Sequence, residues 1–344
     1  IVWKGALKLI ERYPLFGTGP ETFAYTYWWT RPVEHNYTSE WNFLYNKAHN
    51  EWLNLAANTG LLGLGSHILL LIWFSVWGVK SLNRARYGSG DCKEPYLTVA
   101  ILAGIWGVEA VNILGFSTVT VGVYTYMFMA LAINNFKCQI SNVKLNNKLP
   151  NSQLSLLQIG EIGVIGAIGA YLLIQIFIMF IADLGYNKGK QYAEAGYAEE
   201  ALPILTNVVQ LRPNEPVFRE ELGEIQIARI IQISQNNSEN SEKIKLDINT
   251  AINNFEIVRR RNPYQVPFLR SQGKYIFALG EVDNSLYERG IELTLQSIKL
   301  ASTDPLGYYQ LGVFYEQLGE VDLAKENYRK ALELKADWAE AKKN

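Results

Sequence analysis

Three apolar stretches between residues 61 and 182 restrict the fold of this chain more than any other feature. The first, LLGLGSHILLLIWFSVWGV, has about the 20 residues needed to span the hydrocarbon core of a bilayer. The second is about twice that length and breaks near GFSTVT, which indicates two helices joined by a tight hairpin. Buried helices of a large soluble protein are the alternative, but the runs are too long and too weakly amphipathic for it. We therefore predict four transmembrane helices, at about 61–79, 96–115, 119–136 and 156–182.

Positively charged residues between these stretches predict the orientation of the chain. They are Lys80, Arg84, Arg86 and Lys93 in the first loop, and Lys137, Lys144 and Lys148 in the loop before the last span. Short loops rich in Lys and Arg stay in the cytoplasm. Residues 1–60 and 183–344 are then extracytoplasmic, whereas Cys92 and Cys138 lie on the reducing side. Two cysteines so placed predict no disulfide framework.

Four polar residues fall within or near the predicted spans: His67, Glu109, Asn112 and Glu161. Such groups are costly in hydrocarbon and usually face the interior of a helix bundle or a cavity. For the carboxylates and the amide we favour hydrogen bonding between helices, and for His67 a packed or interfacial position. The chain has only three histidines, too scattered for metal-ligand spacing, so no metal site is predicted.

The last part of the chain, residues 183–344, contains an internal helical repeat. The segment 305–337 has Leu-Gly, aromatic and Ala positions with the spacing of a tetratricopeptide repeat. Residues 184–214 follow the same pattern, and two looser units lie between them, one with a polar insertion at 234–243. Because one such unit cannot bury its apolar face alone, we predict about four stacked helix pairs in an α-solenoid. The predicted fold class is all-α, a polytopic bundle followed by this solenoid.

The first 60 residues form a separate extracytoplasmic region with short helices. An amphipathic helix is predicted from Trp3 to Arg12, and Pro14 should end it. The following GTGP lacks the Lys and Ser or Thr of a nucleotide-binding loop. Aromatic residues are dense in YTYWWTRPVEHNYTSEWNFLY. They fit either a membrane-interface belt or the stacking of sugar rings, and composition does not separate the two.

His49 is the residue in this region best suited to acid–base chemistry. It precedes NEWLNLAANTG, which has helical spacing, and therefore lies near a helix start at the outer membrane surface. An imidazole there could take a proton from a hydroxyl group, with Lys47 nearby as a cation for a phosphate. The alternative is a structural histidine at a helix start.

The sequence HNEWLNLAANTGLLG resembles the signature of the O-antigen ligase and O-antigen polymerase superfamily. That signature has His, then Asn, Ser or Gln, nine residues, Gly, two residues and a second Gly. Here its positions are His49, Asn50, Gly60 and Gly63. The upstream YPLFGTGPETF is similar to the family's run before this loop, and a C-terminal tetratricopeptide extension suits many proteins of the group.

The resemblance implies a metal-independent membrane glycosyltransferase of the bacterial plasma membrane that needs no cofactor. Such enzymes move a glycan from undecaprenyl diphosphate to an acceptor hydroxyl on a glycan, a lipid or a protein. The matched residue His49 would be the general base, with Asn50, Gly60 and Gly63 in support. Family arginines hold the carrier diphosphate, and Arg31 and Lys47 are positional candidates. Because the sequence begins at Ile1, we expect a fragment without activity of its own.

Two other functions remain open on the sequence. The chain could be a membrane-anchored repeat adaptor for envelope assembly, with a structural His49 and a protein partner on the repeats. A transporter is the third possibility, but no matching pair of broken helices is visible. Nucleic-acid binding is not expected, because the chain has a formal net charge of −1 and no basic stripe.

Overall fold

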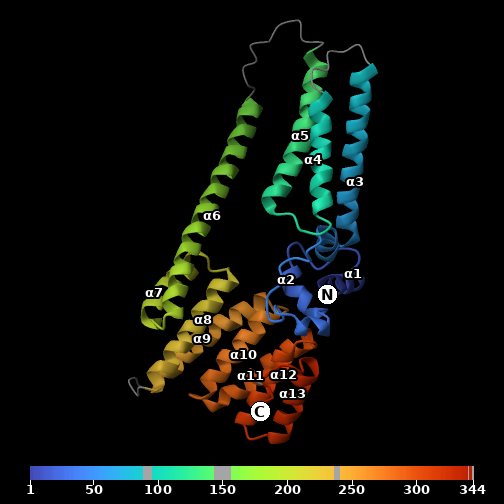
Figure 1. Ribbon diagram of the computed structural model, residues 1–344. Coiled ribbons are helices and arrows are strands. Elements are labelled where there is room, and N and C mark those ends of the chain that lie inside the picture. The colour runs from blue at the N-terminus through green and yellow to red at the C-terminus, as the bar shows by residue number, and fades with distance from the viewer. Residues whose placement is uncertain (88–94, 143–155, 236–240, 340, 343–344) are drawn as a thin grey trace. The chain divides into compact units, whose positions relative to one another are not determined.

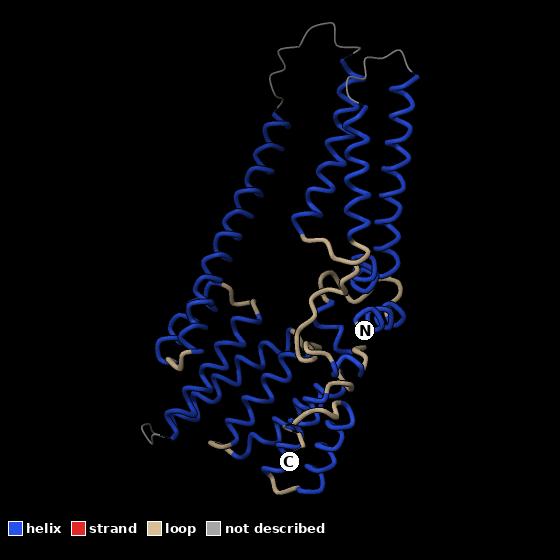
Figure 2. Tube along the Cα trace, in the orientation of Figure 1, coloured by secondary structure: helices blue, strands red, loops and turns tan. Residues whose placement is uncertain are grey.

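The computed structural model describes residues 1–87, 95–142, 156–235, 241–339 and 341–342, and these residues form helices and connecting turns without a strand. The all-α expectation is therefore confirmed for the described part of the chain (Figures 1 and 2). The chain forms two compact units, Ile1–Ser152 and Gln153–Asn344.

The first unit begins with a small extramembrane region, which we call the head, residues 1–59. Its helices are α1 (Val2–Arg12), α2 (Phe23–Thr26), η1 (Tyr27–Trp29) and η2 (Val33–Tyr37). The helix α1 is amphipathic, and the predicted helix from Trp3 to Arg12 is confirmed within one residue. Its inner face contributes Ala6 and Leu9 to the head core. The other fully buried members of that core are Phe23, Tyr27, Ala48 and Ala57.

Three longer helices lie side by side in the same unit (Figure 1). They are α3 (Glu51–Tyr87), α4 (Pro95–Val111) and α5 (Val119–Asn142). Their shared core consists of Leu71, Phe74, Ile105, Met129 and Ala132. Many of their other apolar side chains are exposed, as expected of helices that contact lipid.

All four predicted spans are helices, but only two of them have both the length and the composition to cross a membrane. These two are Glu51–Ser81 in α3 and Gly160–Glu194 in α6 (Leu156–Glu194). The apolar parts of α4 and α5 are shorter, Leu97–Val111 and Val119–Ile133. A polytopic four-helix bundle therefore stays a prediction.

The second unit is a series of helix pairs that begins within α6. After α6 follow α7 (Ala198–Leu211), α8 (Pro216–Gln235), α9 (Ser241–Arg261), α10 (Val266–Gly280), η3 (Asn284–Leu286), α11 (Tyr287–Leu300), α12 (Pro305–Gln317) and α13 (Val321–Leu334). Consecutive helices pack against each other as α6 with α7, α8 with α9, α10 with α11, and α12 with α13. Half of the predicted insertion at 234–243, residues 236–240, lies outside the described residues.

Glycines explain why the two helices of a pair approach so closely. A Cβ added to Gly223 would lie 2.7 Å from the Phe255 ring, and one added to Gly312 would lie 2.6 Å from the Tyr328 ring. Each glycine lies on the first helix of its pair and each aromatic ring on the second. Small residues facing aromatic ones are the basis of the repeat pattern in the sequence.

The helix α6 differs from its prediction, because it does not end where the apolar run ends. It continues as one helix to Glu194 and provides the first helix of the first repeat pair. Ala182, Tyr186, Tyr192 and Ala193 pack in the same cluster as Leu205 of α7. No proline interrupts the sequence between 182 and 194, so nothing in it stops the helix.

The structure does not describe most of the residues that predict the orientation. Lys93, Lys144, Lys148 and Cys92 lie outside the described residues, and the side chains of Arg84, Arg86, Lys137 and Cys138 are not described either. The extracytoplasmic placement of residues 1–60 and 183–344 therefore stays a prediction.

Candidate functional site

The backbone at His49 holds an uncommon conformation. Its φ is +54°, in the left-handed region that few residues other than glycine adopt. Immediately after it, the Asn50 side chain accepts a hydrogen bond of 2.9 Å from the Leu53 N–H and caps helix α3. Ala48 and Asn50 are buried, whereas His49 is exposed. The capped helix start thus fixes the backbone and turns the imidazole outward.

The His49 imidazole lines a recess of about 360 Å³. Its ring meets Tyr45 and Phe116 edge to face, with centroid distances of 6.2 and 5.4 Å. The recess is lined by Glu40, Phe43, Leu44, Tyr45, Asn46, Lys47, His49 and Phe116. Among the residues that the structure describes, none forms a hydrogen bond or an ion pair with this imidazole. Both ring nitrogens are therefore available to a substrate.

Gly60 produces a kink that separates a short surface helix from the rest of α3. Its φ is +69° and its ψ is −176°, values that no helical residue has. A Cβ at this position would lie 2.2 Å from the Leu15 carbonyl oxygen. Residue 60 must therefore be glycine for two independent reasons, its backbone angle and the close approach of the loop that contains Leu15.

The upstream run YPLFGTGPETF and the signature HNEWLNLAANTGLLG bind each other through their backbones at this kink. The Thr18 and Gly19 N–H groups donate to the carbonyls of Ala57 and Asn58, at 3.0 and 2.8 Å. In return, the Leu61 N–H donates to the Pro14 carbonyl at 2.7 Å. These backbone hydrogen bonds hold the surface helix, and with it His49, in a fixed place.

Gly63 is also a site of close packing. A Cβ there would lie 2.0 Å from the Thr59 hydroxyl oxygen, which itself donates to the Leu55 carbonyl at 2.7 Å. Gly60 and Gly63 accordingly have structural reasons to be glycine and do not line the recess.

The two cationic candidates lie in different surroundings. Lys47 lines the recess and forms an ion pair with Glu21 at 2.5 Å. Arg31 is 2% exposed, donates to the Trp41 carbonyl and the Asn36 side chain at 2.7 and 2.8 Å, and lies over the Trp28 ring. The structure thus brings Lys47 to His49 but places Arg31 in the head interior.

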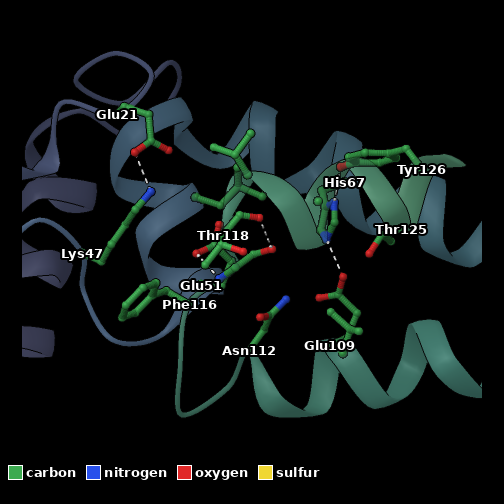
Figure 3. A pocket seen from close by; sticks show the side chains of 15 residues that line it. Glu21, Lys47, Glu51, His67, Glu109, Asn112, Phe116, Thr118, Thr125 and Tyr126 are labelled. Carbon is green, nitrogen blue, oxygen red and sulfur yellow. Dashed lines mark hydrogen bonds and ion pairs between the residues drawn. The ribbon is translucent and has the colours of Figure 1, made fainter. Parts of the chain in front are cut away.

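A second cavity of about 430 Å³ lies between α3, α4, α5 and the head (Figure 3). We call it the polar pocket; Lys47 and Phe116 line both it and the recess. Its other lining residues are Glu21, Glu51, Leu55, His67, Val108, Glu109, Asn112, Ser117, Thr118, Val119, Gly122, Thr125 and Tyr126.

The predicted polar residues of the spans meet in this pocket. His67 Nε2 lies 3.3 Å from Glu109 Oε1, and His67 Nδ1 lies 3.4 Å from the Tyr126 hydroxyl. Glu109 therefore forms a hydrogen bond between helices, as predicted, although its partner could not be named from the sequence. Glu161 does not share this environment; it is exposed on α6. No pattern in the sequence indicated Phe116 or Glu51, because their places in the pocket depend on how α3, α4 and the segment after α4 pack.

Metal binding finds no support in the described ranges, where no three His, Cys, Asp or Glu side chains are grouped as metal ligands. The expectation of a metal-independent site stays a prediction.

Three solved structures of MamA are similar to this chain: a double mutant, a fragment from Desulfovibrio magneticus RS-1 and a further crystal structure. They are 19%, 20% and 22% identical, cover 45%, 47% and 44% of this chain and 75%, 79% and 77% of their own, and have TM-scores of 0.35, 0.35 and 0.32. No curated protein matches.

Family models match at both ends of the chain. Residues 307–337 match a tetratricopeptide repeat, within the segment where the sequence predicted one. The model described as O-antigen ligase matches residues 1–68, which include His49, Asn50, Gly60 and Gly63. The resemblance is therefore confirmed for two segments: residues 1–68 are similar to O-antigen ligases, and residues 307–337 to a tetratricopeptide repeat.

Proposed function

We propose that this protein is a membrane glycosyltransferase of the O-antigen ligase type. It would transfer a glycan from undecaprenyl diphosphate to an acceptor hydroxyl outside the cytoplasm. The observation that carries the proposal is the exposed, outward-turned imidazole of His49, at the histidine position of the matched segment. The open recess around it supports a substrate-binding role.

The proposed location is the bacterial plasma membrane, crossed by α3, α4, α5 and α6. Exposed apolar side chains on all four helices support this arrangement, as does the length of α3 and α6. The head and the repeat pairs would then lie on the extracytoplasmic side, as the Lys and Arg content of the loops predicts.

In the proposed reaction, the acceptor oxygen attacks the anomeric carbon of the lipid-linked sugar and forms a new C–O bond. The bond between that carbon and the diphosphate oxygen breaks, and undecaprenyl diphosphate leaves with the electron pair. The His49 imidazole takes the proton of the acceptor hydroxyl, which is the usual task of a histidine general base. No cofactor is consumed.

Lys47 is the proposed contact for the diphosphate, because it lines the recess together with His49. An ammonium has three donors, and Glu21 needs only one of them. Arg31 is not proposed for this role, since its guanidinium is buried and donates to the head itself.

The test is glycan transfer in membranes that contain the protein with His49→Gln. We expect the rate to fall by about 10²–10⁴-fold, the usual contribution of a general base. Lys8→Ala, a change on the exposed face of α1, is the matched control and should leave the rate unchanged. Normal transfer by His49→Gln protein at a normal expression level would exclude the general-base role.

The repeat pairs favour a second candidate function, a membrane-anchored adaptor. The observation is that α6 is both a predicted span and the first repeat helix, so a partner bound to the repeats would be held at the membrane. We propose that these repeats recruit an acceptor protein or an assembly partner. Removal of residues 198–344 should abolish recovery of that partner with the membranes. An adaptor without enzymatic function would still recover its partner in His49→Gln protein and would lose that recovery in the truncated form.

A further inference from the structure

The polar pocket contains hydrogen-bond acceptors that the protein itself does not use. Glu109 is 5% exposed; its Oε1 faces His67, and its Oε2 has no partner among the described residues. Asn112 is also 5% exposed, and within the described ranges its side-chain amide has no partner. Glu51 accepts from the Ser117 N–H at 3.2 Å with one oxygen only. These three side chains line the pocket with acceptor oxygens to spare, so they are suited to a ligand that donates hydrogen bonds.

The charges of the pocket exclude an anionic ligand. Glu21, Glu51 and Glu109 line it, and Lys47 is the one Lys or Arg among its lining residues, so the carboxylates outnumber the cation. A diphosphate would meet these carboxylates at short range, which is unfavourable in a partly buried site. The ligand should therefore be neutral and rich in hydroxyl groups.

The shape of the pocket fits a small polyol. Its volume of about 430 Å³ is within the range of small-molecule sites. Phe116 provides a flat apolar wall. An aromatic ring suits the apolar face of a sugar, and the carboxylates suit the hydroxyl groups at its edge. Phe116 also contacts the His49 ring at a centroid distance of 5.4 Å, so one aromatic side chain separates the pocket from the recess.

From these features we infer that the polar pocket binds a neutral sugar unit of the acceptor. This inference rests on the proposed function and identifies the acceptor class for the same site. Hydroxyl groups of the sugar donate to Glu109, Glu51 and Asn112, while its ring lies against Phe116. The reacting hydroxyl projects past Phe116 toward His49, and the carrier diphosphate stays on the Lys47 side of the recess.

His67 has a positioning role in this arrangement. Its Nε2–H donates to Glu109, and its Nδ1 accepts from the Tyr126 hydroxyl, so three helices hold the carboxylate in one orientation. The carboxylate thereby keeps its free oxygen toward the pocket (Figure 3).

The test measures sugar binding directly and separately from transfer. The protein is placed in lipid nanodiscs, and saturation-transfer NMR follows the binding of methyl glycosides of neutral hexoses. We expect at least one glycoside to bind and its Kd to rise about tenfold with Glu109→Gln, since a hydrogen bond to a charged acceptor is lost. Glu51→Gln should act in the same direction and serves as the second variant if the first does not fold. Glu161→Gln, a carboxylate exposed on α6, is the control that should not change Kd.

Three outcomes would overturn the inference: no glycoside binding to the unaltered protein, an unchanged Kd in both pocket variants, or displacement of the glycoside by inorganic pyrophosphate. His49→Gln protein should bind glycosides as the unaltered protein does and yet fail to transfer. If that variant transferred glycan normally while Glu109→Gln weakened binding, the general-base proposal would fail and the pocket assignment would stand.

Discussion

The recess and the polar pocket share a wall at Phe116 but hold their histidines in opposite ways. His49 is exposed, stands on a left-handed backbone and has only aromatic neighbours. His67 is mostly buried and is held between a carboxylate and a tyrosine hydroxyl. The His49 nitrogens are open to a substrate, whereas those of His67 face groups of the protein itself. This difference is the basis for proposing chemistry in the recess and binding in the pocket.

The same comparison shows what the sequence signature encodes. Of its four residues, only His49 reaches the recess; Asn50 caps the helix, and Gly60 and Gly63 permit close backbone packing. The signature therefore contains one side chain that can take part in chemistry, and its other three residues stabilise the backbone that positions it. Most of the pocket residues lie outside the signature; Glu109, Asn112 and Tyr126, for example, come from α4, the loop after it and α5.

Gly60→Ala should have the largest effect and should disable recess and pocket together. The added methyl group would strain a left-handed residue and press against the Leu15 carbonyl. The expected loss of stability is about 3 kcal/mol, from a left-handed penalty of about 1–2 and overpacking of about 1–3. Thermal unfolding in detergent micelles, followed by tryptophan fluorescence, would measure it.

Gly65→Ala is the matched control for that change, since nothing lies within 4 Å of its Cβ position and its backbone is helical. Equal stability of the two variants would contradict the assigned role of the kink.

Phe116→Ala should affect both cavities less severely. Loss of the shared aromatic wall should weaken glycoside binding and slow transfer, each by up to about tenfold, because ring contacts contribute about 0.5–1.5 kcal/mol. Phe116→Tyr keeps the ring and should retain both functions. An effect on only one of the two would show that the cavities do not share this wall in function.

Asn50→Ala should affect the recess alone. Loss of the helix cap costs about 1 kcal/mol and loosens the backbone that turns His49 outward. We expect a rate of transfer several-fold lower with glycoside Kd unchanged. Asn253→Ala, a change at an exposed position of α9, is the control and should leave both unchanged. A weaker glycoside affinity would mean that the cap also supports the pocket.

His35 provides the smallest predicted effect and a contrast with both other histidines. Burial lowers its pKa to about 4, and the neighbouring Arg31 acts in the same direction. The folded head therefore keeps His35 neutral, and its contribution to stability is complete above pH 6.5 and lost as the pH falls toward 4. The loss should be below about 1 kcal/mol between pH 7 and 6.

Unfolding midpoints across this pH range would measure the effect, and His35→Gln should remove it. A stability that rises as the pH falls would contradict the assignment of His35 as a buried, neutral side chain.

Local patterns in the sequence were sufficient for much of the fold. The helix from Trp3 to Arg12, the matched repeat at 307–337 and the His49 signature all depend on spacing within one segment. Pairings between segments could not be predicted. His67 and Glu109 meet because of the register between α3 and α4, and Arg31 is buried because the head folds around it.

The continuity of α6 could have been predicted from the sequence, since no proline follows the apolar run that ends at Ala182. Change of composition suggested a boundary there, but a helix ends for backbone reasons and not because its surroundings change.

The most direct test of the central claim compares His49→Gln with Glu109→Gln in one transfer assay with varied acceptor concentration. If the recess performs the chemistry and the pocket binds the acceptor, His49→Gln should lower kcat by about 10²–10⁴-fold with acceptor KM nearly unchanged. Glu109→Gln should raise acceptor KM about tenfold with a smaller change in kcat. The account would be contradicted if His49→Gln raised KM alone or if Glu109→Gln abolished kcat.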